Sequence, residues 1–248
     1  MDACIPLHPG ERIDDLQRGG LRIIQREAGF RFGTDAVLLA AFCDVKKSDV
    51  VVDLGTGTGV IPLLINARTG CRVIGVELQE RCASLAKENA ALNGRQDDIR
   101  ILCADLRTLS PMEGVTAVVC NPPYERVGSG RISENESVRI ARHEFCCTLR
   151  DAVCAASRLL GTGGRLFMIH RAERAAELIY EMKRVRIEPK RLRPIQARAE
   201  SDPRYVLVAG KKDASAGLKL MRPLIIYGAD GKYTREMNEI YHREEADG

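Results

Sequence analysis

The stretch Asp53-Leu54-Gly55-Thr56-Gly57-Thr58-Gly59 decides the fold of this chain. It extends the apolar run Val50-Val51-Val52, whose β-branched side chains are typical of a buried strand, and it leads into a helical pattern over residues 59–67. Glycines at such a junction allow unusual backbone angles, so that a ligand can lie against bare backbone at the helix N-terminus. The spacing is G-x-G-x-G, whereas dinucleotide-binding enzymes carry G-x-G-x-x-G, and a dehydrogenase is therefore disfavoured.

Strand and helix patterns alternate on both sides of this turn. Strands are expected at residues 50–54, 72–77, 99–103, 115–120 and 165–170, and helices at residues 36–42, 59–67, 80–92, 142–160 and 173–183. This alternation predicts an α/β, Rossmann-like fold with a mostly parallel sheet and helices on both faces. An antiparallel hairpin of residues 191–196 and 205–210 completes seven strands. Residues 224–227 are expected to start a second hairpin that turns at Asp230-Gly231, with a short helix from Thr234.

Length and composition indicate one globular domain with extensions. The 248 residues are 45% hydrophobic and 29% charged, which suits a chain that buries a full core. We expect an N-terminal extension over residues 1–31, the main domain over residues 32–212, and a C-terminal extension over residues 213–248 packed on that domain. No signal pattern or membrane-spanning apolar run is present, so the predicted location is cytoplasmic, without a membrane partner. The nine cysteines form no C-x-x-C pair, which predicts reduced thiols and no metal.

Positive charge is concentrated in one segment. Residues 183–212 hold ten Lys and Arg side chains against three acids, whereas the whole chain carries a net charge of only +4. Such a local excess favours a polyanionic partner such as nucleic acid, and a solvated charged face is the alternative.

Acidic residues end three successive strands of the predicted sheet. Asp53 precedes the glycine-rich turn, Glu77 ends the second strand, and Asp105 follows the third. A carboxylate at the position of Glu77 can bind both hydroxyls of a ribose, and Asp105 is placed to meet an adenine amine. This set is typical of S-adenosylmethionine (SAM)-dependent methyltransferases of class I, in which the glycine-rich turn faces the amino-acid end of the cofactor. The expected cofactor contacts in that turn are Gly55, Gly57 and Gly59.

A proline corner, Asn121-Pro122-Pro123-Tyr124, follows the fourth strand. Two prolines cannot continue a strand, so the chain turns outward at the edge where α/β sheets bind ligands. The corner resembles the D/N/S-P-P-Y/F motif of amino-methyltransferases, whose substrates are adenine, cytosine or glutamine amines. The resemblance implies that Asn121 lies beside the cofactor methyl group and that its side-chain oxygen and the Pro122 carbonyl accept hydrogen bonds from a planar amine. Tyr124 would stack on that planar group.

Motifs along nearly the whole chain narrow the resemblance further. Phe32-Gly33-Thr34-Asp35-Ala36-Val37-Leu38-Leu39, Arg142-His143-Glu144 and the tail from Pro223 to Thr234 stand in order around the proline corner. Together they resemble the bacterial tRNA1(Val) adenine-N6 methyltransferase family, which modifies adenine 37, on the 3′ side of the anticodon. The resemblance implies a chain that binds the anticodon stem-loop of a tRNA, and we expect a monomer or a weak homodimer.

The family resemblance, the local composition and the basic segment together give expected roles to individual residues. Thr34 and Asp35 are expected to contact the cofactor, with capping of the following helix as the alternative. Residues 125–140 are expected to form a mobile flap beside the site, and His170 ends the fifth strand near it. The expected RNA contacts are Arg142, His143, Lys190, Arg191 and Arg193. For Arg142 and His143, a solvated or capping role is the alternative.

Three other functions are also compatible with this sequence. A glutamine-N5 methyltransferase of release factors shares the proline corner, but it normally carries an N-terminal helical substrate domain. Only about thirty residues precede the Phe32 segment here, which are too few for such a domain. A guanine-N2 rRNA methyltransferase is a second enzymatic alternative. A SAM-sensing RNA-binding module without catalysis is the alternative from another class, and the intact Asn121–Tyr124 corner argues against it.

Overall fold

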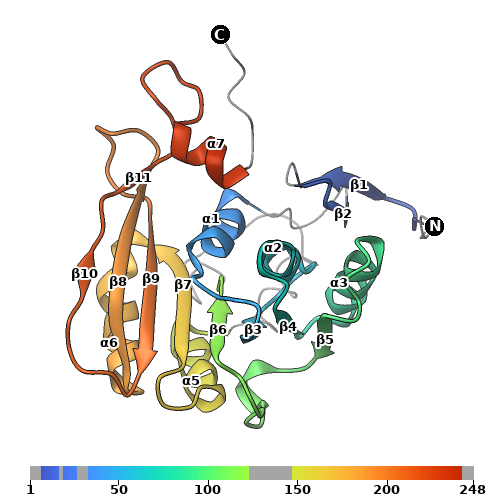
Figure 1. Cartoon of the computed structure of the whole chain (residues 1–248), viewed down its shortest axis with the longest axis horizontal. Coiled ribbons are helices and arrows are strands. Elements are labelled where there is room, and N and C mark those ends of the chain that lie inside the picture. Colours follow the sequence, from blue (N-terminus) through green and yellow to red (C-terminus); the bar gives the residue numbers. More distant parts are fainter. Residues whose placement is uncertain (1–6, 17–18, 27–32, 123–146, 242–248) are drawn as a thin grey trace, which may run out of the picture.

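The computed structural model describes residues 7–16, 19–26, 33–122 and 147–241, and its centre is one nine-stranded sheet (Figure 1). In sheet order, the strands are β10 (Lys219–Leu220), β8 (Ile187–Gln196), β9 (Tyr205–Lys212), β7 (Arg165–Arg171), β6 (Ala117–Cys120), β3 (Val50–Leu54), β4 (Arg72–Glu77) and β5 (Ile99–Cys103). Strand β11 (Leu224–Ile225) also pairs with β8. Within this sheet β9 runs antiparallel to both of its neighbours, and the other pairings are parallel. The predicted mostly parallel α/β sheet is confirmed.

Helices cover both faces of this sheet (Figure 1). One face carries α1 (Thr34–Phe42), α2 (Val60–Thr69), α3 (Glu80–Leu92) and α7 (Arg235–Tyr241), and the other carries α5 (Leu149–Leu159) and α6 (Ala175–Arg184). Side chains alternate between the two cores along each strand, so that Val119 packs on the α1 side and Val118 on the α5 side. Because the central strands are buried on both faces, their sequences are almost continuously apolar.

The antiparallel part of the sheet differs in detail from its prediction. Strand β8 begins at Ile187 and not at Arg191, although Pro189 cannot donate a hydrogen bond to a neighbouring strand. A bulge between Pro189 and Arg191 accommodates the missing N–H group. The two hairpin strands also join the sheet in the reverse of their chain order, because the second strand, β9, lies between β7 and β8. The short strands β10 and β11 add to the seven strands predicted.

The second predicted hairpin is wrong in its pairing. Strand β11 pairs in parallel with the end of β8, and the Ile226 N–H group donates to the Gln196 carbonyl at 3.0 Å. Among the described residues, the expected hairpin is reduced to a single bridge between Tyr227 and Tyr233. In the turn between them, the Gly228 N–H group donates to the Lys232 carbonyl at 2.9 Å. The predicted short helix that follows is confirmed as α7.

A separate two-stranded sheet, formed by β1 (Glu11–Asp15) and β2 (Arg22–Arg26), packs against α3. Asn89 of α3 is fully buried and anchors β2, because its Oδ1 accepts from Ile24 N–H at 2.6 Å and its Nδ2 donates to Ile24 O at 3.2 Å. The same Nδ2 donates to the Thr58 carbonyl at 2.9 Å, so one side chain joins this sheet to the glycine-rich turn. The sequence pattern missed β1, whose five residues include a single apolar one, Ile13.

Candidate active site

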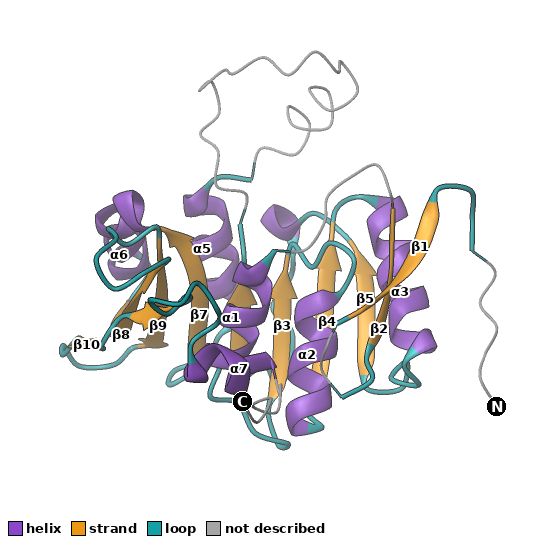
Figure 2. Cartoon of the chain, turned by 90° about the horizontal axis from the view of Figure 1, so that it is seen from above, coloured by secondary structure: helices purple, strands orange, loops and turns teal. Residues whose placement is uncertain are grey.

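The carboxyl ends of β3, β4 and β5 lie along one edge of the sheet (Figure 2), and the strand register places the end of β6 at the same edge. The pairing places Leu54 of β3 opposite both Val76 of β4 and Cys120 of β6. Open α/β sheets bind their ligands at this edge. The structure thus brings together the predicted residues that end or follow these strands, which are Asp53, Gly55, Gly57, Gly59, Glu77, Asp105 and Asn121.

The glycine-rich turn is held against β4 by main-chain and carboxylate hydrogen bonds. Its three glycines have φ values of 75°, 56° and 85°, which side chains with a Cβ rarely adopt. The Gly55 and Thr56 N–H groups donate to the Val76 carbonyl at 2.9 and 3.0 Å. Glu77, which is 8% exposed, accepts from Gly57 N–H through Oε2 and from Gln79 N–H through Oε1, both at 2.9 Å. Glu77 therefore orders the turn as well as ending β4.

Asp53 is a fully buried carboxylate beneath this turn. Neither of its oxygens accepts a hydrogen bond of normal geometry from the described residues. Burial raises the pKa of Asp53 to about 7, the neighbouring Thr56 hydroxyl opposes the rise, and the negative charge of Glu77 adds to it. Because an uncompensated buried charge is costly, this position favours a cationic ligand nearby.

Asp105 caps the short 3-10 helix η1 (Leu106–Thr108) and holds an arginine that the sequence pattern did not single out. Its carboxylate accepts from the Arg107 N–H group at 2.8 Å and from the Arg107 guanidinium at 2.6 to 3.0 Å. The Arg107 hydrogen bonds keep the pKa of Asp105 below its usual value. Arg158 of α5 donates to the carbonyls of Leu106 and Arg107, both at 2.9 Å, and thereby fixes η1.

The proline corner meets the start of α1. The Asn121 Nδ2 group donates to Asp35 Oδ2 at 3.0 Å, and Pro122 is buried. Gly33 occupies the N-cap position of α1 without a side-chain cap, so Thr34 and Asp35 are the first two residues of the helix. Asp35 Oδ1 instead accepts from the N–H group of the next residue, Ala36, at 3.0 Å. The predictions for Tyr124, Arg142, His143 and the flap at residues 125–140 lie outside the described residues.

The three described residues that were expected to contact RNA all have partners within the chain. Lys190 Nζ donates to the Ser215 carbonyl at 3.1 Å. Arg191 pairs with Asp44 at 3.1 Å, and its guanidinium lies 5.0 Å from the centre of the Phe42 ring. Arg193 pairs with Glu236 of α7. In the same basic segment, the exposed side chains of Arg198 and Arg204 form no ion pair among the described residues. They are therefore more accessible to a polyanion than the three partly buried cations above.

Replacing Arg193 with alanine is expected to loosen α7. The Arg193 guanidinium, 17% exposed, makes two contacts of 2.6 and 2.7 Å with Glu236 and donates to the Arg222 carbonyl at 3.1 Å. Loss of such a bidentate, partly buried pair costs about 1–2 kcal/mol. Hydrogen exchange should show faster exchange in α7, with Arg198→Ala as the control. Unchanged protection of α7 would contradict a structural role for Arg193.

His170 lies buried near the carboxyl end of β7, close to this edge, whereas one pocket lies away from it. His170 is fully buried, its Nδ1 accepts from Arg171 N–H at 2.8 Å, and burial lowers its pKa to about 4, so the ring is neutral near pH 7.

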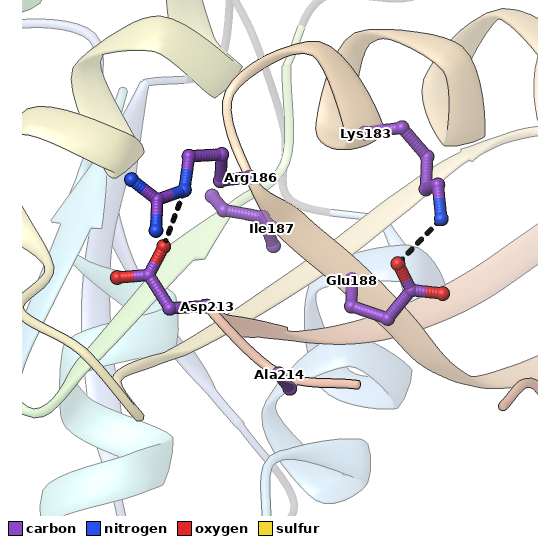
Figure 3. Close-up of a pocket in the computed structure, with 6 residues that line it drawn as sticks. All are labelled: Lys183, Arg186, Ile187, Glu188, Asp213 and Ala214. Atoms are coloured by element: carbon purple, nitrogen blue, oxygen red, sulfur yellow. Dashed lines mark hydrogen bonds and ion pairs between the residues drawn. The ribbon is translucent and has the colours of Figure 1, made fainter. Parts of the chain in front are cut away.

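The pocket lies where β8 begins and β9 ends (Figure 3). The strand register places it at the opposite edge of the sheet from the proline corner. Its charged side chains neutralise one another in the pairs Lys183–Glu188 and Arg186–Asp213, at 2.6 and 2.9 Å.

The described residues hold no candidate metal site and no membrane-spanning helix. No three His, Cys, Asp or Glu side chains in these parts of the chain are grouped so that they could hold a metal ion. No helix among them is long and apolar enough to cross a membrane.

Comparisons with known proteins match this architecture. Residues 29–187 match the sequence family described as methyltransferase small domain. A tRNA1(Val) (adenine(37)-N6)-methyltransferase of Porphyromonas gingivalis is 30% identical over 226 residues, which cover 86% of this chain and 88% of the relative. A protein of the same name from Haemophilus influenzae is 28% identical over 222 residues, covering 88% and 92% of the two chains. The crystal structure of a predicted O-methyltransferase from Agrobacterium tumefaciens superposes with a TM-score of 0.70 at 23% identity, covering 84% of this chain and 96% of the other, and supports the fold.

Proposed function

Since the chain belongs to the methyltransferase small domain family and is a SAM-dependent methyltransferase, we propose that it methylates the exocyclic N6 of an adenine in tRNA, namely adenine 37 of tRNA1(Val). The observation that carries this proposal is the Asn121-Pro122 corner, which ends β6 at the same edge as the glycine-rich turn. The names of the relatives at 28–30% identity point to the same substrate.

The residues at the sheet edge suit the cofactor. When bound, SAM supplies an electrophilic methyl group on a positively charged sulfur. Nearly buried Glu77, together with Asp53 when it is ionised, gives this edge negative charge, which suits a cationic ligand. We assign the ribose hydroxyls to Glu77, the adenine amine to Asp105, the amino-acid end to the glycine-rich turn, and further cofactor contacts to Thr34 and Asp35.

The proline corner would orient the amine that accepts the methyl group. Adenine N6 is a poor nucleophile because its lone pair is conjugated with the ring. Asn121 Oδ1 and the Pro122 carbonyl accept its two hydrogens and turn the lone pair toward the methyl carbon, while Tyr124 stacks on the base. The nitrogen would become cationic as it bonds to the methyl carbon, the carbon–sulfur bond would break with its electron pair left on the now neutral sulfur, and the surplus proton on nitrogen would pass to water. No strong base is needed at the corner, which agrees with the lowered pKa of the buried His170, because a ring with that pKa is a weak proton acceptor.

An anticodon loop is a suitable RNA for this site. A loop base can leave its stack more cheaply than a duplex base, at a cost of roughly a few kcal/mol, and can then stack on an aromatic ring. The exposed cations Arg198 and Arg204 supply charge for the RNA phosphates. Arg142 and His143 complete the proposed RNA contacts.

The test is methyl transfer from labelled SAM to total tRNA from a strain that lacks this enzyme, followed by nucleoside analysis. We expect label in N6-methyladenosine, and a tRNA1(Val) transcript with guanosine at position 37 should accept none. Label in N2-methylguanosine would support the guanine-N2 alternative, and label in release factor would support the glutamine alternative. Binding of SAM and tRNA without any transfer would indicate a sensing module.

A further inference from the structure

We propose that Asp35 is a positioning residue that fixes which way the Asn121 side-chain amide faces. The two side chains are 86 residues apart in sequence, and the Asn121 Nδ2 group donates to Asp35 Oδ2 at 3.0 Å. A carboxylate only accepts hydrogen bonds, so it selects the NH₂ end of the amide. Oδ1 is then the end of the amide that accepts from the substrate amine, which makes this inference rest on the proposed function.

The start of α1 holds Asp35 in place for this contact. Its second oxygen, Oδ1, accepts from the Ala36 N–H group at 3.0 Å, and the helix N-terminus stabilises a negative charge there. Gly33 leaves room for this position of the carboxylate, because a Cβ atom at residue 33 would force Asp35 Oδ1 to shift. The Gly33-Thr34-Asp35 segment therefore presents a carboxylate whose geometry is set before substrate binds.

The orientation matters because the two ends of an amide have opposite hydrogen-bonding character. If the Asn121 amide rotated by half a turn, its NH₂ group would face the NH₂ group of adenine. Two donors cannot form a hydrogen bond, so the contact that turns the lone pair of N6 would be lost. Asp35 thus acts on the reaction through Asn121.

A reciprocal exchange tests this role. Asn121→Asp by itself places two carboxylates about 3 Å apart, where repulsion disrupts the corner, and we expect transfer to fall by about 100-fold. In the double variant Asp35→Asn/Asn121→Asp, the amide at position 35 donates to the carboxylate at position 121, which keeps an oxygen for the substrate. The double variant should recover at least about tenfold in kcat over Asn121→Asp. No recovery would overturn the proposal.

Single substitutions at position 35 separate positioning from folding and from cofactor binding. Asp35→Ala should lower kcat by about 10- to 100-fold. Asp35→Asn should lower it less, because its amide oxygen still accepts from Asn121. A positioning role lowers kcat even at saturating SAM, whatever change the loss of the proposed cofactor contact makes to the Kd for SAM, and it leaves the melting temperature of both variants close to that of the unchanged protein. Asp97→Asn, in an exposed turn before β5, is the control. A rise in the SAM Kd with unchanged kcat would overturn the proposal in favour of cofactor binding alone.

A readout without substrate distinguishes this inference from the proposed function. The side-chain amide resonances of Asn121, assigned by their loss in Asn121→Ala, should shift on Asp35→Ala in the protein free of RNA. If they shift but tRNA accepts no methyl group, the contact stands and the proposed substrate is wrong. If they do not shift, the Asp35 contact is absent in solution and the positioning role is refuted.

Discussion

Replacing Asn121 with alanine is expected to lower methyl transfer to tRNA by about 100- to 1,000-fold while the Kd for SAM changes little. The substitution removes an acceptor that acts on the reacting amine, whereas the Pro122 carbonyl remains because it belongs to the main chain. The proposed cofactor contacts of the glycine-rich turn, Glu77 and Asp105 are untouched. The measurements are single-turnover transfer from labelled SAM and calorimetric titration of SAM in the absence of tRNA.

The outcome has clear alternatives. Asn238→Ala, which removes a partly exposed asparagine from α7, is the matched control and should leave the transfer rate unchanged. If Asn121→Ala weakens SAM binding as much as it slows transfer, the asparagine serves mainly to hold the cofactor. If transfer proceeds at its normal rate, the corner is not the acceptor site and the proposed mechanism fails.

The elements of the sheet could be predicted from sequence because each central strand has a local signature. Strands β3, β4, β6 and β7 are largely apolar runs buried on both faces, the edge strand β5 buries Ile99 and Ile101, and each strand is bounded by glycine, proline or an acid. Strand β1 had no such signature, since Glu, Arg and Asp make up most of it. Strand β8 was predicted too short because Pro189 argues locally against a strand, and only the pairing with β9 shows that a bulge accommodates it.

The site was predictable in its composition but not in its contacts. The positions of Asp53, Glu77, Asp105 and Asn121 follow from strand ends, which are local features. Two of their partners are distant in sequence, since Asn121 donates to Asp35 of α1 and Glu77 accepts from the Gly57 N–H group. Asp105 instead pairs with the nearby Arg107. Side-chain pairing across the fold has no sequence periodicity, so pattern analysis does not detect it.

Charge shows the same limit. Residues 183–212 hold ten cations, but the sequence alone does not show which of them form ion pairs in the fold. In the fold, Arg191 reaches Asp44 and Arg193 reaches Glu236, so both tie neighbouring elements to β8. The charge available to a polyanion is therefore smaller than the count suggests, and the β8–β9 loop with Arg198 and Arg204 becomes the part of this segment to test first.

Replacing Asp53 with asparagine is expected to stabilise the cofactor-free protein above pH 7. The pKa of Asp53 is raised by burial to about 7, whereas an unfolded aspartate titrates near pH 4. Folding therefore favours the protonated form, and the free energy of unfolding falls as pH rises from about 4 to 7 and is level above that range. The difference of about three pH units corresponds to at most about 4 kcal/mol. Asparagine stays neutral, so the variant escapes this loss.

Urea unfolding of both proteins between pH 5 and pH 8 measures the effect, and Asp49→Asn supplies a control of opposite sign. Burial raises the pKa of Asp49, but hydrogen bonds from the Lys46 N–H group, Arg165 and Thr116 outweigh it and hold the pKa below its usual value. The stability from Asp49 is present above pH 4 and is lost as pH falls, so Asp49→Asn should destabilise at pH 8. Equal stability of Asp53→Asn and the unchanged protein at pH 8 would mean that the Asp53 charge already has a compensating partner without the cofactor. A stabilised variant that binds SAM more weakly would instead show that this uncompensated carboxylate serves the cationic cofactor at a cost in stability.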